Sequence, residues 1–201
     1  MQSVFRQVQL VQFDSKSQVE AQIHRNAPAN RLAVIEESFS PSRSWKNPNQ
    51  STDSIWDWRT KKSLLDGGSS ILSELLVEET TQGAILVGTS PLDSRIKPGV
   101  KVLELEYVES APWNIANSNG GKAEFVGIGY VLVVEAILLS RKLQLGGRLG
   151  LHSRPDAEPF YRDKCQFTEI GPDFNADGLV YFEATAEQSE RLMARLGLGE
   201  E

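Results

Sequence analysis

Cysteine and histidine are scarce in this chain of 201 residues, and basic residues are fewer than acidic ones. The single cysteine, Cys165, excludes an intrachain disulfide and a zinc site built from several cysteines, and it is typical of a reducing compartment. Lysine and arginine number 21 against 27 acidic residues, which gives a net charge of −6. Nucleic acid is therefore not expected as a partner, because phosphate binding needs a basic surface.

Long hydrophobic runs are also missing. The most apolar stretch, residues 125–139, contains Glu135 and is shorter than the roughly 18 to 20 residues that cross a bilayer. The N-terminal segment is polar and does not have the basic-then-apolar order of a signal peptide. We therefore expect a cytoplasmic globular protein with no membrane partner.

The first half of the chain shows weak local patterns. Residues 18–25 predict a short helix and residues 31–36 a strand, and the Ser-, Asn- and Pro-rich stretch 38–54 predicts irregular backbone. A further short helix should end at the Asp66-Gly67-Gly68 breaker. Runs at 71–78 and 84–89 around a turn at 80–83 predict an antiparallel hairpin.

The second half is patterned more strongly. Residues 100–108 alternate as a strand, residues 127–143 form a helix apolar on nearly all sides, and residues 148–152 form another strand. This order is a βαβ unit with parallel strands. A short helix at 155–164, a hairpin of 167–170 with 179–184, and a last helix at 185–196 capped by Thr185 and Gln188 follow. The fold class is α+β: a mixed, mostly antiparallel sheet with a central parallel pair and flanking helices.

The turn Glu124-Phe125-Val126-Gly127-Ile128-Gly129-Tyr130 opens the apolar helix. Free amides at a helix N-terminus attract phosphate, and glycines let an anion approach the backbone. A tight helix start also explains two glycines without any ligand. The turn is neither a Rossmann fingerprint, because the third glycine is absent, nor a Walker A loop.

A second segment, A-E-P-F-Y-R-D-K-C-Q-F at 157–167, follows about thirty residues later. Together the two segments resemble the GNAT superfamily of acetyl-coenzyme A-dependent N-acyltransferases, over about residues 71–185 of a single domain spanning 1–201. Glu124 stands where that family prefers Gln or Arg. Cys165-Gln166 replaces a small residue, and Arg154 stands where an Asn often lies.

The resemblance implies acetyl-coenzyme A as co-substrate and no metal. It places the pyrophosphate on backbone amides of five residues: Val126, Gly127, Ile128, Gly129 and Tyr130. The pantetheine arm would pair near Tyr107 and Val108, between strands 100–108 and 148–152. Tyr161 matches the tyrosine that commonly protonates the leaving thiolate, although a Phe-Tyr pair also packs a core.

The base and the acceptor contacts are less defined. Glu106 and Glu109 are the candidates for removing a proton from the amine, with water as the alternative, while neighbouring Glu104 shares a face with Glu106. Trp113, Asn114 and His152 are expected to contact the acceptor, although a strand-end histidine is also explained by a simple hydrogen bond.

The expected function is transfer of an acetyl group from acetyl-coenzyme A to an amine of a small molecule or a protein. The alternatives are a non-catalytic acyl-coenzyme A binding pseudoenzyme and a protein-interaction module that uses residues 1–70. A homodimer is left open.

Overall fold

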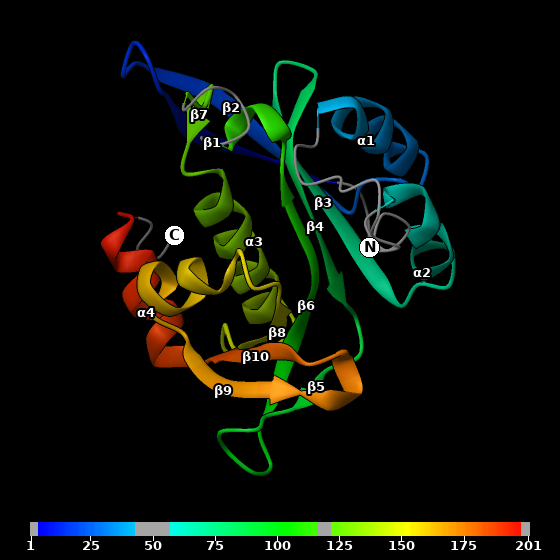
Figure 1. The fold of residues 1–201 in the computed structure, drawn as a ribbon, viewed down its shortest axis with the longest axis vertical. Coiled ribbons are helices and arrows are strands. Elements are labelled where there is room, and N and C mark those ends of the chain that lie inside the picture. Colours follow the sequence, from blue (N-terminus) through cyan, green and yellow to red (C-terminus); the bar gives the residue numbers. More distant parts are fainter. Residues whose placement is uncertain (1–3, 43–56, 116–121, 198–201) are drawn as a thin grey trace. The chain divides into compact units, whose positions relative to one another are not determined.

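A computed structural model describes residues 4–42, 57–115 and 122–197 (Figure 1). They form two compact units, each made of separated stretches of chain. Unit 1 contains residues 1–86 and 107–132, and unit 2 contains residues 87–106 and 133–201. Three elements continue from one unit into the other: β4 (Thr80–Gly88), β6 (Lys101–Ser110) and α3 (Ile128–Lys142). Because the units alternate along the chain, no linker sequence separates them.

Unit 1 contains an antiparallel arrangement of strands in the order β7-β1-β2-β3-β4. The strands not yet introduced are β1 (Val4–Gln12), β2 (Gln18–Arg25), β3 (Ser70–Val77) and β7 (Phe125–Val126). β1 pairs with β2 from Val4↔Arg25 to Val11↔Gln18. β2 pairs in turn with β3.

The helix predicted at residues 18–25 is wrong, because this segment is strand β2. Ala21 and Ile23 are buried on one face with the period of two that is typical of a strand. Pairing with strands on both sides outweighs the local helix propensity, which is a weak preference.

The strand predicted at residues 31–36 is also wrong, because α1 (Arg31–Phe39) is a helix. Its buried residues are Leu32, Ile35, Glu36 and Phe39. They recur at the three- and four-residue spacing of one helix face. The predicted strand ended at Glu36 and so left out Phe39, which completes this pattern.

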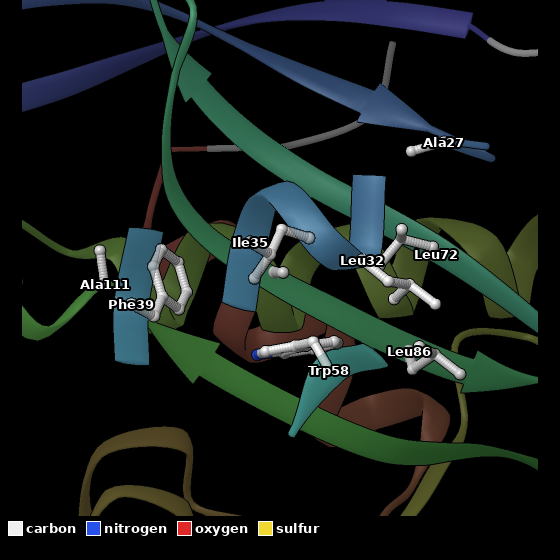
Figure 2. Packing of buried hydrophobic residues seen from close by; sticks show 9 residues of the cluster. Ala27, Leu32, Ile35, Phe39, Trp58, Leu72, Leu86 and Ala111 are labelled. Atoms are coloured by element: carbon white, nitrogen blue, oxygen red, sulfur yellow. The ribbon is translucent and has the colours of Figure 1, made fainter. Parts of the chain in front are cut away.

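The core of unit 1 lies under α1 and the segment that returns to the sheet (Figure 2). This segment comprises the 3-10 turn Trp58–Lys61 and α2 (Lys62–Asp66), so the helix predicted to end at the glycine breaker is confirmed. Another 3-10 turn, Ser40–Ser42, follows α1. The irregular stretch predicted at 38–54 lies mostly outside the described residues. Trp58 is the largest side chain of the core and is almost fully buried.

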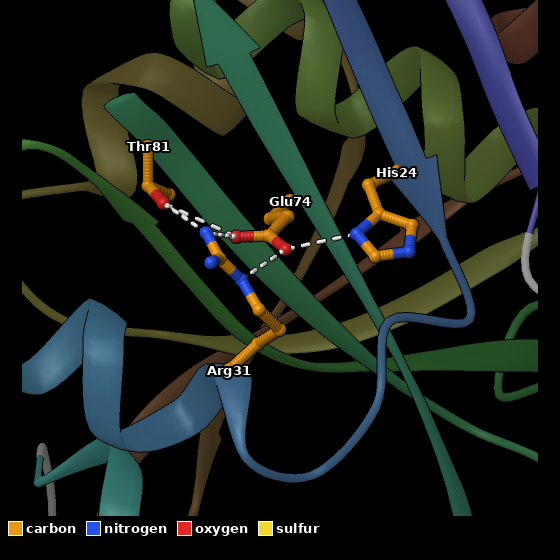
Figure 3. A network of polar contacts seen from close by, with 4 residues as sticks. All are labelled: His24, Arg31, Glu74 and Thr81. Atoms are coloured by element: carbon orange, nitrogen blue, oxygen red, sulfur yellow. Dashed lines mark hydrogen bonds and ion pairs between the residues drawn. The ribbon is translucent and has the colours of Figure 1, made fainter. Parts of the chain in front are cut away.

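A buried polar network also ties α1 to the strands (Figure 3). Glu74 on β3 is fully buried, and its two oxygens accept hydrogen bonds from Arg31 Nε at 2.8 Å and Nη2 at 2.9 Å. Thr81 Oγ1 donates to the same carboxylate at 3.1 Å, and His24 Nδ1 lies 3.0 Å from it. A buried carboxylate is tolerated because several donors replace its water.

The hairpin of β3 and β4 is confirmed, but its turn lies earlier than predicted. Glu78, with φ of 53°, begins the connection, and Thr81 and Gln82 are buried strand residues. Gly83 lies within the strand. A larger residue would not fit there, because a Cβ would come 2.8 Å from Ile128 Cγ2 and 2.9 Å from Leu132 Cδ1. The first turn of α3 therefore packs directly on the β4 backbone.

Unit 2 contains strands in the order β6-β8-β10-β9, with β5 (Leu92–Asp93) paired to β6. The remaining strands are β8 (Leu149–Ser153), β9 (Thr168–Asp173) and β10 (Leu179–Ala184). β6 and β8 are parallel, whereas β8, β10 and β9 are antiparallel. The predicted α+β class and its parallel pair are confirmed.

The helices of the second half agree with the sequence patterns. α3 is buried along most of its length, and α4 (Ala186–Arg195) begins with a capping box between Thr185 and Gln188. The helix predicted at 155–164 contains a π-helical turn, Phe160–Cys165. A 3-10 turn, Phe174–Ala176, follows β9 in the connection to β10. None of the described helices is both long and apolar enough to cross a membrane.

Candidate functional site

The backbone that precedes the glycine turn is fixed by hydrogen bonds in unit 1. β7 pairs with β1 through Val11↔Val126 and Gln12↔Phe125. The Glu124 carbonyl accepts from the Phe13 amide at 2.9 Å, while the Glu124 amide donates to the Trp113 carbonyl at 3.0 Å. These bonds hold the chain as an edge strand up to the residue before Gly127, and they leave the Glu124 side chain exposed.

Gly127 itself is exposed and has a φ of 85°, a conformation that favours glycine. Apart from its two chain neighbours, no heavy atom of the described residues lies within 4 Å of the position that a Cβ would take. α3 begins at Ile128, and its Val131 amide donates to the Gly127 carbonyl at 3.1 Å. The first amides of an α-helix find no acceptor within the helix itself. With the helix dipole they can bind an anion.

The predicted pantetheine contacts lie on the part of β6 that belongs to unit 1. Tyr107 and Val108 are half-buried, and the Lys61 ammonium lies 4.0 Å from the centre of the Tyr107 ring. Val126 and Tyr130, at the glycine turn, are exposed and half-buried respectively.

The predicted acceptor residues Trp113 and Asn114 lie in the 3-10 turn Pro112–Asn114 of unit 1 and contact the same glutamine. Trp113 Nε1 donates to Gln82 Oε1 at 2.8 Å, and Asn114 Nδ2 donates to that oxygen at 2.9 Å. Asn114 Oδ1 in turn accepts from the Phe125 amide at 2.9 Å. Both side chains thus support the backbone that leads into the glycine turn.

Glu109, a predicted base, is buried in unit 1. Its Oε2 accepts a hydrogen bond of 2.6 Å from Trp58 Nε1. The other predicted base, Glu106, belongs to unit 2 and is half-buried, with its Oε1 3.2 Å from the position of a Cβ at Gly88. The two carboxylates therefore have different surroundings.

The parallel pairing of β6 and β8 in unit 2 is short. Leu103 pairs with Leu149 and Glu104 with Gly150, and within the described residues the pairing ends there although both strands continue. Residues paired in register lie on the same face of a sheet. Since Gly150 pairs with Glu183 and His152 with Tyr181, one face collects Glu104, Glu106, His152, Tyr181 and Glu183.

His152 is held on that face by an acidic residue from β9. Its Nε2 lies 3.0 Å from Asp173 Oδ2, and Arg95 Nη2 also donates to this carboxylate. Asp173 is only 10% exposed. The hydrogen bond from Arg95, followed by those from His152 and the Asn175 amide, holds the Asp173 pKa well below its usual range. The Asp173 carboxylate is therefore ionised near neutral pH.

Tyr181 lies beside His152, with 4.9 Å between the ring centres. The Arg95 guanidinium carbon is 3.8 Å from the centre of the Tyr181 ring. The Tyr181 hydroxyl is buried and makes no hydrogen bond to the described residues. Burial, then the charge of Glu183, raises the Tyr181 pKa to about 12. A register shift between β9 and β10 occurs at this residue, as is common near functional sites.

Tyr161 lies on the other face of the unit 2 strands. Its ring centre is 5.9 Å from that of Phe182, the neighbour of Tyr181 along β10 and therefore on the opposite face. Burial, then the charge of Cys165, raises the Tyr161 pKa, so the phenol is protonated at neutral pH. Burial also raises the pKa of the Cys165 thiol to about 12, which leaves it a poor nucleophile.

The structure thus distributes the predicted residues over both units. Unit 1 holds the glycine turn with Tyr107, Val108, Glu109, Trp113 and Asn114, and unit 2 holds Glu106, His152 and Tyr161. The sequence did not reveal Arg95, Asp173 and Tyr181, because they come from separate segments and follow no motif. Among the described residues, no cluster of His, Cys, Asp and Glu could hold a metal ion.

No protein-family profile and no curated sequence matches the chain, but many solved structures do. A GNAT-family acetyltransferase from Listeria monocytogenes shares 12% identity and a TM-score of 0.56, covering 87% of this chain and 98% of its own. RimJ from Mycobacterium smegmatis, in complex with CoA-disulfide, shares 13% identity and a TM-score of 0.53 over 98% of each chain.

The aminoglycoside acetyltransferase AAC(6')-Ib, in complex with coenzyme A and kanamycin, shares 18% identity and a TM-score of 0.52. The match covers 84% of this chain and 98% of that one. At these identities the likeness is one of fold. The two sequence motifs and the strand arrangement agree with it: this chain has the fold of the GNAT acetyltransferases.

Proposed function

We propose that this protein transfers an acetyl group from acetyl-coenzyme A to an amine. The observation that carries the proposal is the exposed glycine turn at the N-terminus of α3, in a chain with the GNAT fold. Two of the compared proteins were solved with coenzyme A or its disulfide, and one of these also with an aminoglycoside. Acetyl-coenzyme A and an amine are therefore the partners to test.

The glycine turn fits the diphosphate of the cofactor in shape and in charge. Gly127 leaves open space where a side chain would stand, and the first turn of α3 contains no acidic residue. Amides of residues 128–130 would bind the diphosphate, with Val126 at its edge. Backbone at Tyr107 and Val108 would contact the pantetheine arm. When bound, acetyl-coenzyme A supplies the thioester that is consumed.

Tyr161 is proposed as the acid that protonates the leaving sulfur. The phenol holds its proton at neutral pH and can donate it to a developing thiolate, while its raised pKa makes it a weaker acid than an exposed tyrosine. Its carbonyl accepts the Phe167 amide at 3.0 Å, which fixes the backbone of the π-helical turn. Tyr161→Phe removes the phenolic proton and leaves this backbone hydrogen bond in place.

The opposite face is proposed to receive the amine. Glu104 and Glu106 place negative charge there, which attracts an ammonium group. Of the two predicted bases, Glu106 lies on this face, whereas the Glu109 carboxylate binds the Trp58 indole. Trp113 and Asn114 are proposed to act through the shape of the glycine turn, because both bind Gln82.

Cofactor binding is tested by thermal unfolding with acetyl-coenzyme A. A ligand at about 100 times its Kd stabilises by about 2.7 kcal/mol. For a chain of this size that raises Tm by roughly 5 to 10 °C. Gly129→Glu should abolish the shift by placing a carboxylate at the start of α3. Lys142→Glu, at the exposed last residue of the same helix, is the control and should retain the shift. An unchanged shift in Gly129→Glu would contradict the assigned turn.

Turnover is tested by the release of free thiol with three amines: spermidine, kanamycin and a peptide with a free N-terminus. We expect at least one to be acetylated. Tyr161→Phe should then lower kcat about 10- to 100-fold while the shift with acetyl-coenzyme A persists. If kcat of Tyr161→Phe equals that of the wild type, Tyr161 is not the acid.

A second candidate function is acyl-coenzyme A binding without transfer. The buried Glu109 favours it, because the carboxylate of this predicted base binds the Trp58 indole, and a base is needed for transfer but not for binding. A thermal shift with acetyl-coenzyme A but no acetylation of any of the three amines would select this candidate.

A further inference from the structure

We infer that His152, positioned by Asp173 and Arg95, is the group that takes the proton from the acceptor amine. The inference rests on the proposed function and concerns the same site. It assigns the base to a side chain on β8 rather than to a carboxylate on β6. Three observations support it: the contacts of His152, the charge of Asp173 and the end of the strand pairing.

The contacts determine which nitrogen of His152 carries the proton. An ionised carboxylate can only accept, so Asp173 Oδ2, 3.0 Å from Nε2, selects the tautomer protonated at Nε2. Arg95 keeps Asp173 ionised and in place. The lone pair of the neutral ring is then on Nδ1. The ring is 22% exposed, which leaves it accessible from solvent.

His152 also lies close in sequence to the end of the strand pairing. His152 lies two residues beyond Gly150, where β8 ceases to pair with β6. Tyr161 lies on the opposite face of the same strands. A thioester held where the strands part would have the proposed acid on one side and His152 on the other. This is the arrangement that general acid–base catalysis of acyl transfer requires.

The charged neighbours of His152 suit a base for a cationic substrate. β6 contributes Glu104 and Glu106, β10 contributes Tyr181 and Glu183, β9 contributes Asp173, and the connection that precedes β6 contributes Arg95. Glu183 is already bound, since Ser94 Oγ and the Arg95 amide donate to it. Glu106, which is half-buried on the same face, is assigned the role of attracting the ammonium toward His152.

The proton balance of the reaction is as follows. His152 Nδ1 removes one proton from the ammonium group and passes it to water. The freed nitrogen forms a bond to the acetyl carbon, and the carbon–sulfur bond breaks. Tyr161 gives its proton to the sulfur and regains the second proton from the nitrogen, while the third stays on the amide. One proton is released for each amide and thiol formed.

The discriminating variant is His152→Gln. A glutamine amide can reach the place of Nε2 and still donate to Asp173, so it keeps the structural bond but removes the base. With acetyl-coenzyme A and the amine of the panel that turns over fastest, we expect kcat to fall about 100-fold. The thermal shift with acetyl-coenzyme A should not change. The control is His24→Asn, since His24 is the other histidine of the chain and binds Glu74 through Nδ1. Its kcat should equal that of the wild type.

The pH profile separates a base from a structural residue. Wild-type kcat/KM should fall in acid if a neutral side chain takes the proton, and His152→Gln should lose this limb. Glu106→Gln should raise KM for the amine more than it lowers kcat. Full activity of His152→Gln, or an acid limb lost in Glu106→Gln instead, would overturn the inference.

Nitrogen NMR of the two histidines gives a readout independent of turnover. The inference requires His152 to be protonated at Nε2 in the wild type, and protonation at Nδ1 would refute it whatever the activity. If the wild type acetylates no amine of the panel, the proposed function fails and this inference with it. If the wild type is active and His152→Gln matches it, only this inference fails.

Discussion

Alanine in place of Gly150 would add a methyl group where the Tyr181 hydroxyl already lies. The new Cβ would be 2.0 Å from Tyr181 Oη, 3.0 Å from Cζ and 3.1 Å from Val102 Cγ2. The backbone cannot retreat easily, because Gly150 pairs with Glu104 on one side and Glu183 on the other. Tyr181 cannot swing away either, since it is 1% exposed and packs against Arg95 and His152.

The size of the effect follows from these distances. Ordinary contact begins at 3.4 Å, so the hydroxyl must move by more than 1 Å in a packed interior. Overpacking of this kind costs about 1 to 3 kcal/mol, and we expect Gly150→Ala to cost about 3. At roughly 2 to 4 °C per kcal/mol, Tm should fall by roughly 6 to 12 °C.

Urea unfolding of Gly150→Ala, Tyr181→Phe and the double variant measures the clash directly. Tyr181→Phe should be neutral or stabilising by up to about 1 kcal/mol, because it removes a buried hydroxyl without a hydrogen-bond partner among the described residues. The double variant should lose only about 1 kcal/mol, since the 2.0 Å contact no longer exists. Gly88→Ala is the control, as its closest contact is the flexible Glu106 carboxylate at 3.2 Å.

The clash with Tyr181 would be ruled out if the free energy of unfolding of Gly150→Ala lay within about 1 kcal/mol of the wild type. It would also be ruled out if the effects of the two single substitutions simply added in the double variant, because contacting residues must couple. Either result would mean that the Tyr181 hydroxyl does not lie over Gly150.

Three further changes test other parts of the fold. Trp58→Phe should cost about 2 to 4 kcal/mol in urea unfolding, because it shrinks a buried ring and removes the donor to Glu109. Thr185→Ala should cost about 1 kcal/mol through loss of the α4 capping box, measured as a lower Tm. The lowered pKa of Asp173 means that its stabilising effect is complete above about pH 4 and is lost as the pH falls further. The difference in unfolding free energy between wild type and Asp173→Asn should therefore shrink below about pH 4, and an unchanged difference would contradict the Arg95 contact.

The second half of the chain could be predicted well because its patterns are strong and local. The apolar run of α3 admits only a buried helix, and Thr185 with Gln188 specifies where α4 begins. Two strands joined by a helix of this length are expected to be parallel, which predicts the pairing of β6 with β8. In the first half, a helix was predicted for β2 and a strand for α1. Each predicted segment is too short for its apolar residues to distinguish the period of a strand from that of a helix.

Of the candidate site, only the part built from backbone could be predicted from the sequence. A glycine turn before an apolar helix can be recognised in sequence, because its residues follow one another. The setting of His152 cannot, since Asp173, Arg95 and Tyr181 are brought to it by strand pairing and by a register shift. For the same reason the sequence could not distinguish Glu106 from Glu109, whose different environments depend on Gly88 and Trp58.

The pairing of β7 with β1 gives the N-terminal hairpin a part in shaping the glycine turn, although this hairpin holds none of the predicted site residues. Val11 and Val126 lie far apart in the sequence, yet this contact sets the direction in which the chain enters α3. A shortened protein that begins after β2 would keep every residue of the glycine turn and lose the strand that shapes it.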